Sequence, residues 1–189
     1  MFSTLKKYFY FVLAITIASC GSQKEKSKST AVNTYPNWKY EKSRKSFRGT
    51  LDSQQYLDTK AALEKELNVK IPAGKSILIH FDQKAPNCIN VRFNDNQNSK
   101  IIGTGHSLSD EESVKYNVEE FSVYTADSFF AKKFEANKKF RLDAGYFSTN
   151  IFTLQENCAA FYILKPNGKH ITYYGEDYFS EVKDFFEKK

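Results

Sequence analysis

The side chains best suited to chemistry in this chain are its three cysteines and three histidines. The cysteines are too widely spaced for a Cys-x-x-Cys redox motif: Cys20, Cys88 and Cys158. The histidines lack the spacing of a metal site: His80, His106 and His170. Gly103-Thr104-Gly105 lacks the third glycine of a dinucleotide loop, and His106-Ser107 lies outside a nucleophile elbow, so both segments predict polar turns. Local motifs therefore predict no metal, nucleotide or hydrolase site.

Charged side chains on the predicted strands have structural explanations. His80 follows a short apolar run, so it is predicted to be a core residue with a hydrogen-bonded imidazole. Glu119-Glu120 is either half of a carboxylate pair or a pair of charges that protects an edge strand. Neither pattern alone predicts a catalytic site.

The first twenty residues have the layout of an export signal. Lys6 and Lys7 precede an apolar run over residues 8–17, which is shorter than the roughly 20 residues that span a bilayer. Ile17-Ala18-Ser19-Cys20 resembles the lipobox of bacterial lipoproteins. The resemblance implies that residues 1–19 are a lipoprotein signal peptide and that Cys20 is a diacylglyceryl anchor. The alternative is an ordinary secretory peptide with a coincidental cysteine.

Basic residues concentrate just after this segment. Residues 20–49 contain eight Lys or Arg and two Glu, whereas acidic residues slightly outnumber basic ones over residues 50–189. A nucleic-acid binder needs a basic face on its folded part, so that class is excluded. Residues 20–49 are predicted to be a basic flexible tether that either contacts anionic lipid or is simply solvated. Its aromatic side chains dock either on the domain or at the membrane interface: Tyr35, Trp38, Tyr40 and Phe47.

Residues 50–189 are predicted to form one domain of alternating helices and strands. A capping box at Asp52 and Gln55 begins a helix over residues 53–67, and the apolar run at 76–81 predicts a central strand. Turn residues between two apolar runs predict a hairpin over 159–174. The other expected elements are a polar turn, a helix from Ser109, a strand, an aromatic helical face and a closing helix: 94–99, 109–112, 121–125, 128–140 and 176–187.

Two segments together resemble the thioredoxin fold. Residues 75–81 are similar to its central strand, and residues 161–169 with 173–175 are similar to its C-terminal hairpin. The resemblance implies an α/β, thioredoxin-like three-layer sandwich with a mixed central sheet, a C-terminal β-hairpin and a helix. Its redox motifs are missing, because Ala85 stands three residues before Cys88 and Arg92 stands four after it. The dithiol, peroxiredoxin and copper-chaperone patterns each require a different residue at one of these positions.

The same resemblance relates the two remaining cysteines. In this alignment Cys158 replaces the cis-proline of the family and faces Cys88. The resemblance then implies Cα atoms within about 7 Å, the upper range for a disulfide. Three alternatives stay open: a structural disulfide, a redox-active pair, or two buried thiols that are not bonded.

These expectations describe a membrane-anchored envelope lipoprotein with a non-catalytic thioredoxin-like binding or structural domain. The alternative is a divergent thiol-disulfide oxidoreductase that uses Cys88 with Cys158. We expect no cofactor and no metal. The expected partners are the membrane, through the diacylglyceryl anchor, and an unidentified envelope protein, but not nucleic acid. Because Gly21 rather than Asp follows the anchor cysteine, the lipoprotein resemblance implies the outer membrane, facing the periplasm.

Overall fold

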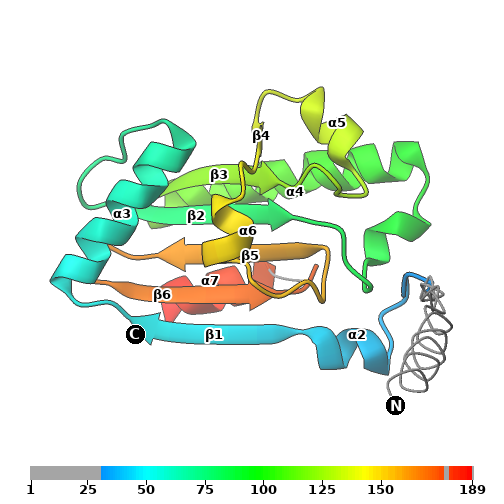
Figure 1. The fold of residues 1–189 in the computed structure, drawn as a ribbon, viewed down its shortest axis with the longest axis horizontal. Helices are drawn as coiled ribbons and strands as arrows, with labels where there is room; N and C mark the ends of the chain where they lie inside the picture. Colours follow the sequence, from blue (N-terminus) through cyan, green and yellow to red (C-terminus); the bar gives the residue numbers. More distant parts are fainter. Residues whose placement is uncertain (1–30, 177–178, 189) are drawn as a thin grey trace, which may run out of the picture. The chain divides into compact units, whose positions relative to one another are not determined.

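A single mixed sheet organises the domain in the computed structural model, which describes residues 31–176 and 179–188 (Figure 1). The expected signal peptide at 1–19 and the anchor at Cys20 lie outside the described residues. The six strands are ordered β1-β6-β5-β2-β3-β4. At the centre, β2 (Ser76–Asp82) is parallel to β3 (Val118–Tyr124) and antiparallel to β5 (Ala159–Leu164). The predicted α/β class with a mixed central sheet is confirmed.

The remaining strands complete the two sides of the sheet. Strand β6 (Lys169–Tyr174) forms the predicted hairpin with β5, and β1 (Lys45–Thr50) pairs antiparallel with β6. At the opposite edge, β4 (Phe140–Leu142) is parallel to β3. The hairpin turn requires Gly168, since its φ is 80° and an added Cβ would lie 2.3 Å from the carbonyl oxygen of Leu51.

Helices cover both faces of the sheet. In Figure 1, α3 and α6 lie in front of it, while α4 and α7 lie behind it. Their bounds, with those of the shorter helices and the 3₁₀ helix η1, are α2 (Trp38–Ser43), α3 (Ser53–Leu67), η1 (Ile89–Arg92), α4 (Asp95–Tyr116), α5 (Ala131–Glu135), α6 (Tyr146–Asn150) and α7 (Phe179–Glu187). The predicted helix over 53–67 is confirmed with its capping box between Asp52 and Gln55.

The alternation of side chains along β2 divides the hydrophobic core between these faces. Ile77, Ile79 and Phe81 pack in one buried cluster with α3 and α6. Leu78 packs in a second cluster that contains Val182 of α7. Full burial of each large apolar side chain stabilises the fold by about 1.5–3 kcal/mol, so the two clusters hold both helical layers on the sheet.

Between β2 and β3 the predicted helix at 109–112 is present, but its predicted start and the two predicted turns are wrong. The expected polar turn at 94–99 and the expected turn at Gly103-Thr104-Gly105 both lie in α4, which begins at Asp95 rather than at Ser109. A second capping box explains the earlier start: Asn94 accepts from the backbone N–H of Gln97, whose side chain accepts from the backbone of Asn94. The helix contains Gly103 and Gly105 without breaking.

The aromatic segment at 128–140 is also less helical than predicted. Only α5, at Ala131–Glu135, is α-helical within it. Phe130 and Phe134 instead turn into a buried cluster with both cysteines, and Phe140 begins β4. Their burial in tertiary structure, not a continuous helical face, explains the spacing of these aromatic residues.

Part of the expected flexible tether at 20–49 belongs to the folded domain, because Asn33 pairs with Asn87 and the segment contains α2 and β1. The side chain of Asn37 accepts from two backbone N–H groups at the start of α2. Tyr40 is buried, and its hydroxyl accepts a 2.7 Å hydrogen bond from the backbone N–H of Glu176. All six residues of β1 pair with β6. These contacts bring a polar, weakly patterned segment into the fold.

Candidate functional site

One end of the central sheet presents polar side chains toward α4. On β2, His80 and Asp82 lie on the same face as Leu78, because side chains alternate along a strand. Glu120 and Ser122 occupy the corresponding face of β3. These residues and α4 line a partly open cavity of about 150 Å³. Its apolar lining comes chiefly from Ile101, Ile102, Phe134, Phe140 and Phe179.

A hydrogen-bonded group of side chains forms the floor of this cavity. Nε2 of His80 lies 2.8 Å from Oγ of Ser109 and 3.0 Å from Oε1 of Glu120. Ser113 donates a 2.8 Å hydrogen bond to Oε2 of Glu120. Burial alone would raise the pKa of Glu120, but hydrogen bonds from His80 and the serines lower it to about 2. Glu120 is therefore an ionised carboxylate at neutral pH.

This group differs from a hydrolase triad in one geometric respect. In such a triad the serine and the acid contact opposite nitrogens of the imidazole. Here Ser109 and Glu120 contact the same nitrogen of His80. The arrangement therefore fixes and orients the carboxylate of Glu120 but does not activate Ser109 as a nucleophile. The imidazole of His80 is hydrogen-bonded, as predicted, but His80 lines the cavity and belongs to none of the described core clusters.

The carboxyl group of Asp82 differs from that of Glu120 in its protonation state. Burial raises its pKa to about 8; a hydrogen bond from Ser128 acts in the other direction, and the charge of Glu176 raises the pKa further. Asp82 is therefore mostly protonated at neutral pH and can donate a hydrogen bond. The cavity thus combines a protonated acid with the ionised carboxylate of Glu120.

Cys88 and Cys158 form a disulfide next to this cavity. Their Cα atoms are 5.2 Å apart, within the distance that the thioredoxin resemblance implied. Both side chains are buried, with exposed fractions of 0% and 1%, in a cluster that includes Phe130 and Phe134. Of the alternatives that the sequence left open, the structure contains the bonded pair and not two separate thiols.

The surroundings of the disulfide disfavour a reactive thiolate. A carboxylate oxygen of Glu176 lies within 4.8 Å of both sulfurs. The same carboxylate accepts hydrogen bonds from the backbone N–H groups of Ile89 and Asn90, which begin η1 next to Cys88. A thiolate at Cys88 would face this negative charge and would lack those donors, so the surroundings would not stabilise it.

Cys88, Cys158 and Glu176 are also residue types that hold metal ions, and their ligand atoms cluster within 4.8 Å. A metal site of this kind needs deprotonated thiolates. Both sulfurs are bonded to each other in this structure. The oxidised cluster is therefore not a metal site, and no residue spacing in the sequence pointed to one.

Three asparagines join the N-terminal segment to the disulfide. Asn33, Asn87 and Asn157 form consecutive parallel bridges. The backbone N–H of Cys88 donates to Asn33, and that of Cys158 donates to Asn87. Asn157 is fully buried and donates a 2.8 Å hydrogen bond to the carbonyl of Ser43 at the end of α2. Residues 33–43 are thereby held at the same corner as the two cysteines.

The remaining predicted sites do not come together. His170 lies on β6, where it packs against Gly49, and His106 lies within α4, not in a loop. Glu119 forms a 2.6 Å ion pair with Lys75, whereas Glu120 lines the same cavity as Asp82. The edge-strand explanation of these charges is wrong, because β3 lies between β2 and β4. Sequence reasoning missed the most informative residues of the site: Asp82, Ser109, Ser122, Ser128 and Glu176.

The cavity and the disulfide are the two features of the described residues that point to a function. Within residues 31–176 and 179–188, no helix combines the length and the apolar character needed to cross a membrane. The chain matches no known family model, no curated protein sequence and no solved structure.

Proposed function

We propose that this protein is a membrane-anchored envelope lipoprotein whose thioredoxin-like domain binds a small ligand and performs no thiol chemistry. The cavity between β2, β3 and α4 is the observation on which the proposal depends. Ligand sites are typically apolar hollows with a few convergent polar groups, and this cavity has that composition. Its volume of about 150 Å³ suits a ligand of roughly the size of benzene.

The connectivity of the strands supports the thioredoxin-like part of the proposal. The path β2-α4-β3 is a parallel crossover, and β5-β6-α7 is a hairpin followed by a helix. In the sheet, the hairpin lies on one side of β2 and β3 lies on the other. The envelope location and the lipid anchor are supported by the lipobox-like segment that ends at Cys20.

The charges of the cavity favour a small organic cation. Its lining contains the carboxyl groups of Asp82, Glu120 and Glu176, and none of the described residues that line it is Lys or Arg. The basic side chain among those residues is His80, which contacts Glu120. An anion would meet repulsion from Glu120, whereas an ammonium group would be attracted to it. Phe134, Phe140 and Phe179 offer aromatic rings for the apolar part of such a ligand or for its charge.

Benzylamine and benzoate test this proposal, because they have similar size and opposite charge. In thermal unfolding of the full chain, benzylamine at saturating concentration should raise Tm by about 5 °C. Benzoate should have no effect. Glu120→Gln should abolish the benzylamine shift, since it removes the carboxylate in the cavity.

Glu119→Gln is the matched control. It changes the neighbouring residue on the same strand, and Glu119 pairs with Lys75 outside the cavity. The control should keep the full response to benzylamine. Equal stabilisation by benzoate, or equal loss of response in both variants, would contradict a cation site at Glu120.

One observation favours a thiol-disulfide oxidoreductase as the second candidate function. The carboxylate of Glu176 lies beside the disulfide, and Asp82, whose pKa is raised, pairs in the sheet with Ala159, the residue after Cys158. An acid–base step in thiol exchange would need such a titratable group. Against it, both sulfurs are buried. We expect the disulfide to resist millimolar dithiol reductant in the folded protein, and we expect no reduction of insulin. Rapid reduction with insulin turnover would instead establish the oxidoreductase.

A further inference from the structure

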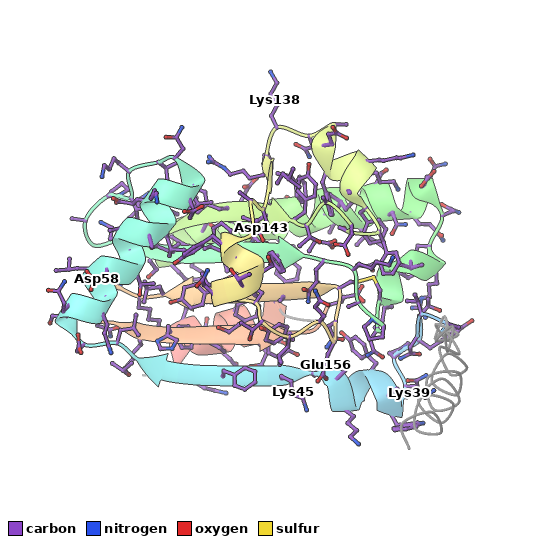
Figure 2. All side chains as sticks on the ribbon, in the orientation of Figure 1. Lys39, Lys45, Asp58, Lys138, Asp143 and Glu156 are labelled. Carbon is purple, nitrogen blue, oxygen red and sulfur yellow. A yellow bond between two sulfur atoms is a disulfide. The ribbon has the colours of Figure 1, made fainter. Side chains whose placement is uncertain are left out.

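A group of aromatic and basic side chains, exposed except for the half-buried Lys45, lies along one edge of the domain. We define the α2–β1 edge by its members: Trp38, Lys39, Lys42, Lys45 and Phe47. Trp38 and Phe47 have exposed fractions of 69% and 52%, although large aromatic side chains are usually mostly buried. Figure 2 shows Lys39 on α2 and Lys45 on β1 along the same border of the domain. Isolated exposed aromatics are ordinary, but here three lysines lie beside them, while Glu41 of the same helix pairs with Arg44.

We propose that the α2–β1 edge docks on an anionic membrane surface. Lysines attract anionic lipid head groups, and tryptophan and other aromatic rings favour the boundary between head groups and acyl chains. Lys39, Lys42 and Lys45 form no ion pair with any described residue, so their charges are available for head groups. By contrast, Arg44 and Arg48 contact Glu41 and Glu181, and they are left out of the proposed surface.

Two further observations identify a membrane, not a protein strand, as the occupant. The edge begins 18 residues after the proposed anchor Cys20 and ends 27 residues after it, so an anchored chain keeps it near lipid. The aromatic residues of this segment had two alternatives, docking on the domain or on the membrane. Tyr40 packs on the domain, with an exposed fraction of 1%. Trp38 belongs to none of the described core clusters, which leaves it for the membrane.

Docking by this edge would leave the cavity accessible. In the sheet order, β6 and β5 separate β1 from β2, and the cavity lies at β2 and β3. The proposal goes beyond ligand binding, and it depends on the proposed function only for the membrane anchor. It adds a second membrane contact that fixes which side of the domain faces lipid.

Trp38 is the only tryptophan in the chain, so its fluorescence reports on the edge directly. The test uses the lipidated full chain with vesicles of phosphatidylglycerol and phosphatidylethanolamine, or of phosphatidylcholine alone. With the anionic vesicles, Trp38 emission should shift to the blue and should be quenched by brominated acyl chains. Both effects should disappear with phosphatidylcholine vesicles. They should also disappear in 1 M salt, where the Debye length falls to about 3 Å and surface charges are screened.

A pair of charge-reversal variants separates docking from general charge. Lys39→Glu with Lys45→Glu should weaken docking at least 10-fold, because each lysine near the surface contributes about a factor of five to binding. Lys132→Glu with Lys138→Glu makes the same change in net charge elsewhere; Figure 2 shows Lys138 at the opposite border of the domain. This control should keep the fluorescence change.

The readouts distinguish failure of the anchor from failure of docking. A chain that does not sediment with vesicles would contradict the proposed anchor. A chain that sediments while Trp38 keeps the emission and accessibility of an exposed indole would overturn docking. Equal losses in the two charge-reversal pairs would also overturn it. A blue shift that appears without lipid as protein concentration rises would assign the edge to a second copy of the chain instead.

Discussion

The two faces of the central sheet are built from the same strands but have different compositions. Toward α3 and α6, Ile77, Ile79 and Phe81 make β2 apolar along its length. Toward α4 and α7, Leu78 is apolar, whereas His80 and Asp82 are polar and line a cavity. The difference shows how one strand can both stabilise a fold and shape a site. Successive side chains point to opposite faces, so one face of β2 packs in the core while the other lines the cavity.

Of the variants that test this difference between the two faces, Phe81→Ala is expected to lower the free energy of unfolding most. Phe81 is buried and stacks on Phe152, with ring centroids 4.3 Å apart. Removal of a buried aromatic ring costs about 3–5 kcal/mol, so the free energy of unfolding in urea should fall by about 4 kcal/mol. Ser122→Ala on the cavity face should cost less than about 1 kcal/mol. Similar costs for the two variants would show that both faces are equally close-packed.

Loss of the disulfide should destabilise the corner beside the cavity. Cys88→Ala combined with Cys158→Ala removes a link across a sequence separation of 70 residues. Such links typically contribute about 2–4 kcal/mol, so we expect a loss of about 3 kcal/mol in urea unfolding. Strong reductant should lower the stability of the parent protein by a similar amount and leave the double variant unchanged. A reductant effect on the variant would mean that the bond is not the cause.

The cavity face should also give the protein a stability that falls on both sides of pH 4–5. The pKa of Asp82 is raised from 3.8 to about 8, so its contribution is present at low pH and is lost as the pH rises from about 4 to about 8. The pKa of Glu120 is lowered from 4.5 to about 2, so its contribution is lost as the pH falls through that range.

Variants assign each arm of this profile to one carboxyl group. Asp82→Asn should flatten the upper arm, whose slope is at most about 1.4 kcal/mol per pH unit, and Glu120→Gln should flatten the lower one. Asp58→Asn, at an exposed position on α3, should keep both arms. Urea midpoints from pH 3 to pH 8 provide the measurement, and a steep upper arm in Asp82→Asn would exclude Asp82 as its source.

Val114→Lys is expected to have the smallest effect. Val114 lies on α4, the helix that covers the cavity face, but its exposed fraction is 85%. Lysine is at least as good a helix former as valine, so stability should stay within about 0.5 kcal/mol of the parent. A larger loss would indicate that the outer side of α4 is also an interface.

The parts of the fold that were predictable have strong local signals. The capping box at Asp52 and the turn at Gly168 fix the ends of their elements through short-range hydrogen bonds and backbone geometry. The equivalent box at Asn94 was missed, because α4 continues through Gly103 and Gly105 without a clear apolar period. Strand β1 was missed for a different reason, since its order depends on pairing with β6, which lies more than 100 residues away.

The cavity was less predictable than the disulfide. Cys88 and Cys158 could be related through the thioredoxin resemblance, and the structure contains their bond. Asp82 and Glu176 come from separate parts of the chain, and only the fold gives them a shared environment. The sequence did contain one signal: His80 and Asp82 are polar residues two positions apart at the end of an apolar strand. The prediction that this strand is buried on both faces overlooked that signal.

The bond between Cys88 and Cys158 also decides what proteolysis can release from this protein. A single cut anywhere over residues 89–157 leaves one cysteine on each fragment, because the covalent ring contains η1, α4, β3, α5, β4 and α6. The two fragments then stay joined and separate only on reduction. A nicked molecule would therefore keep β2 and β5 in one covalent unit, and its damage would be invisible on a non-reducing gel.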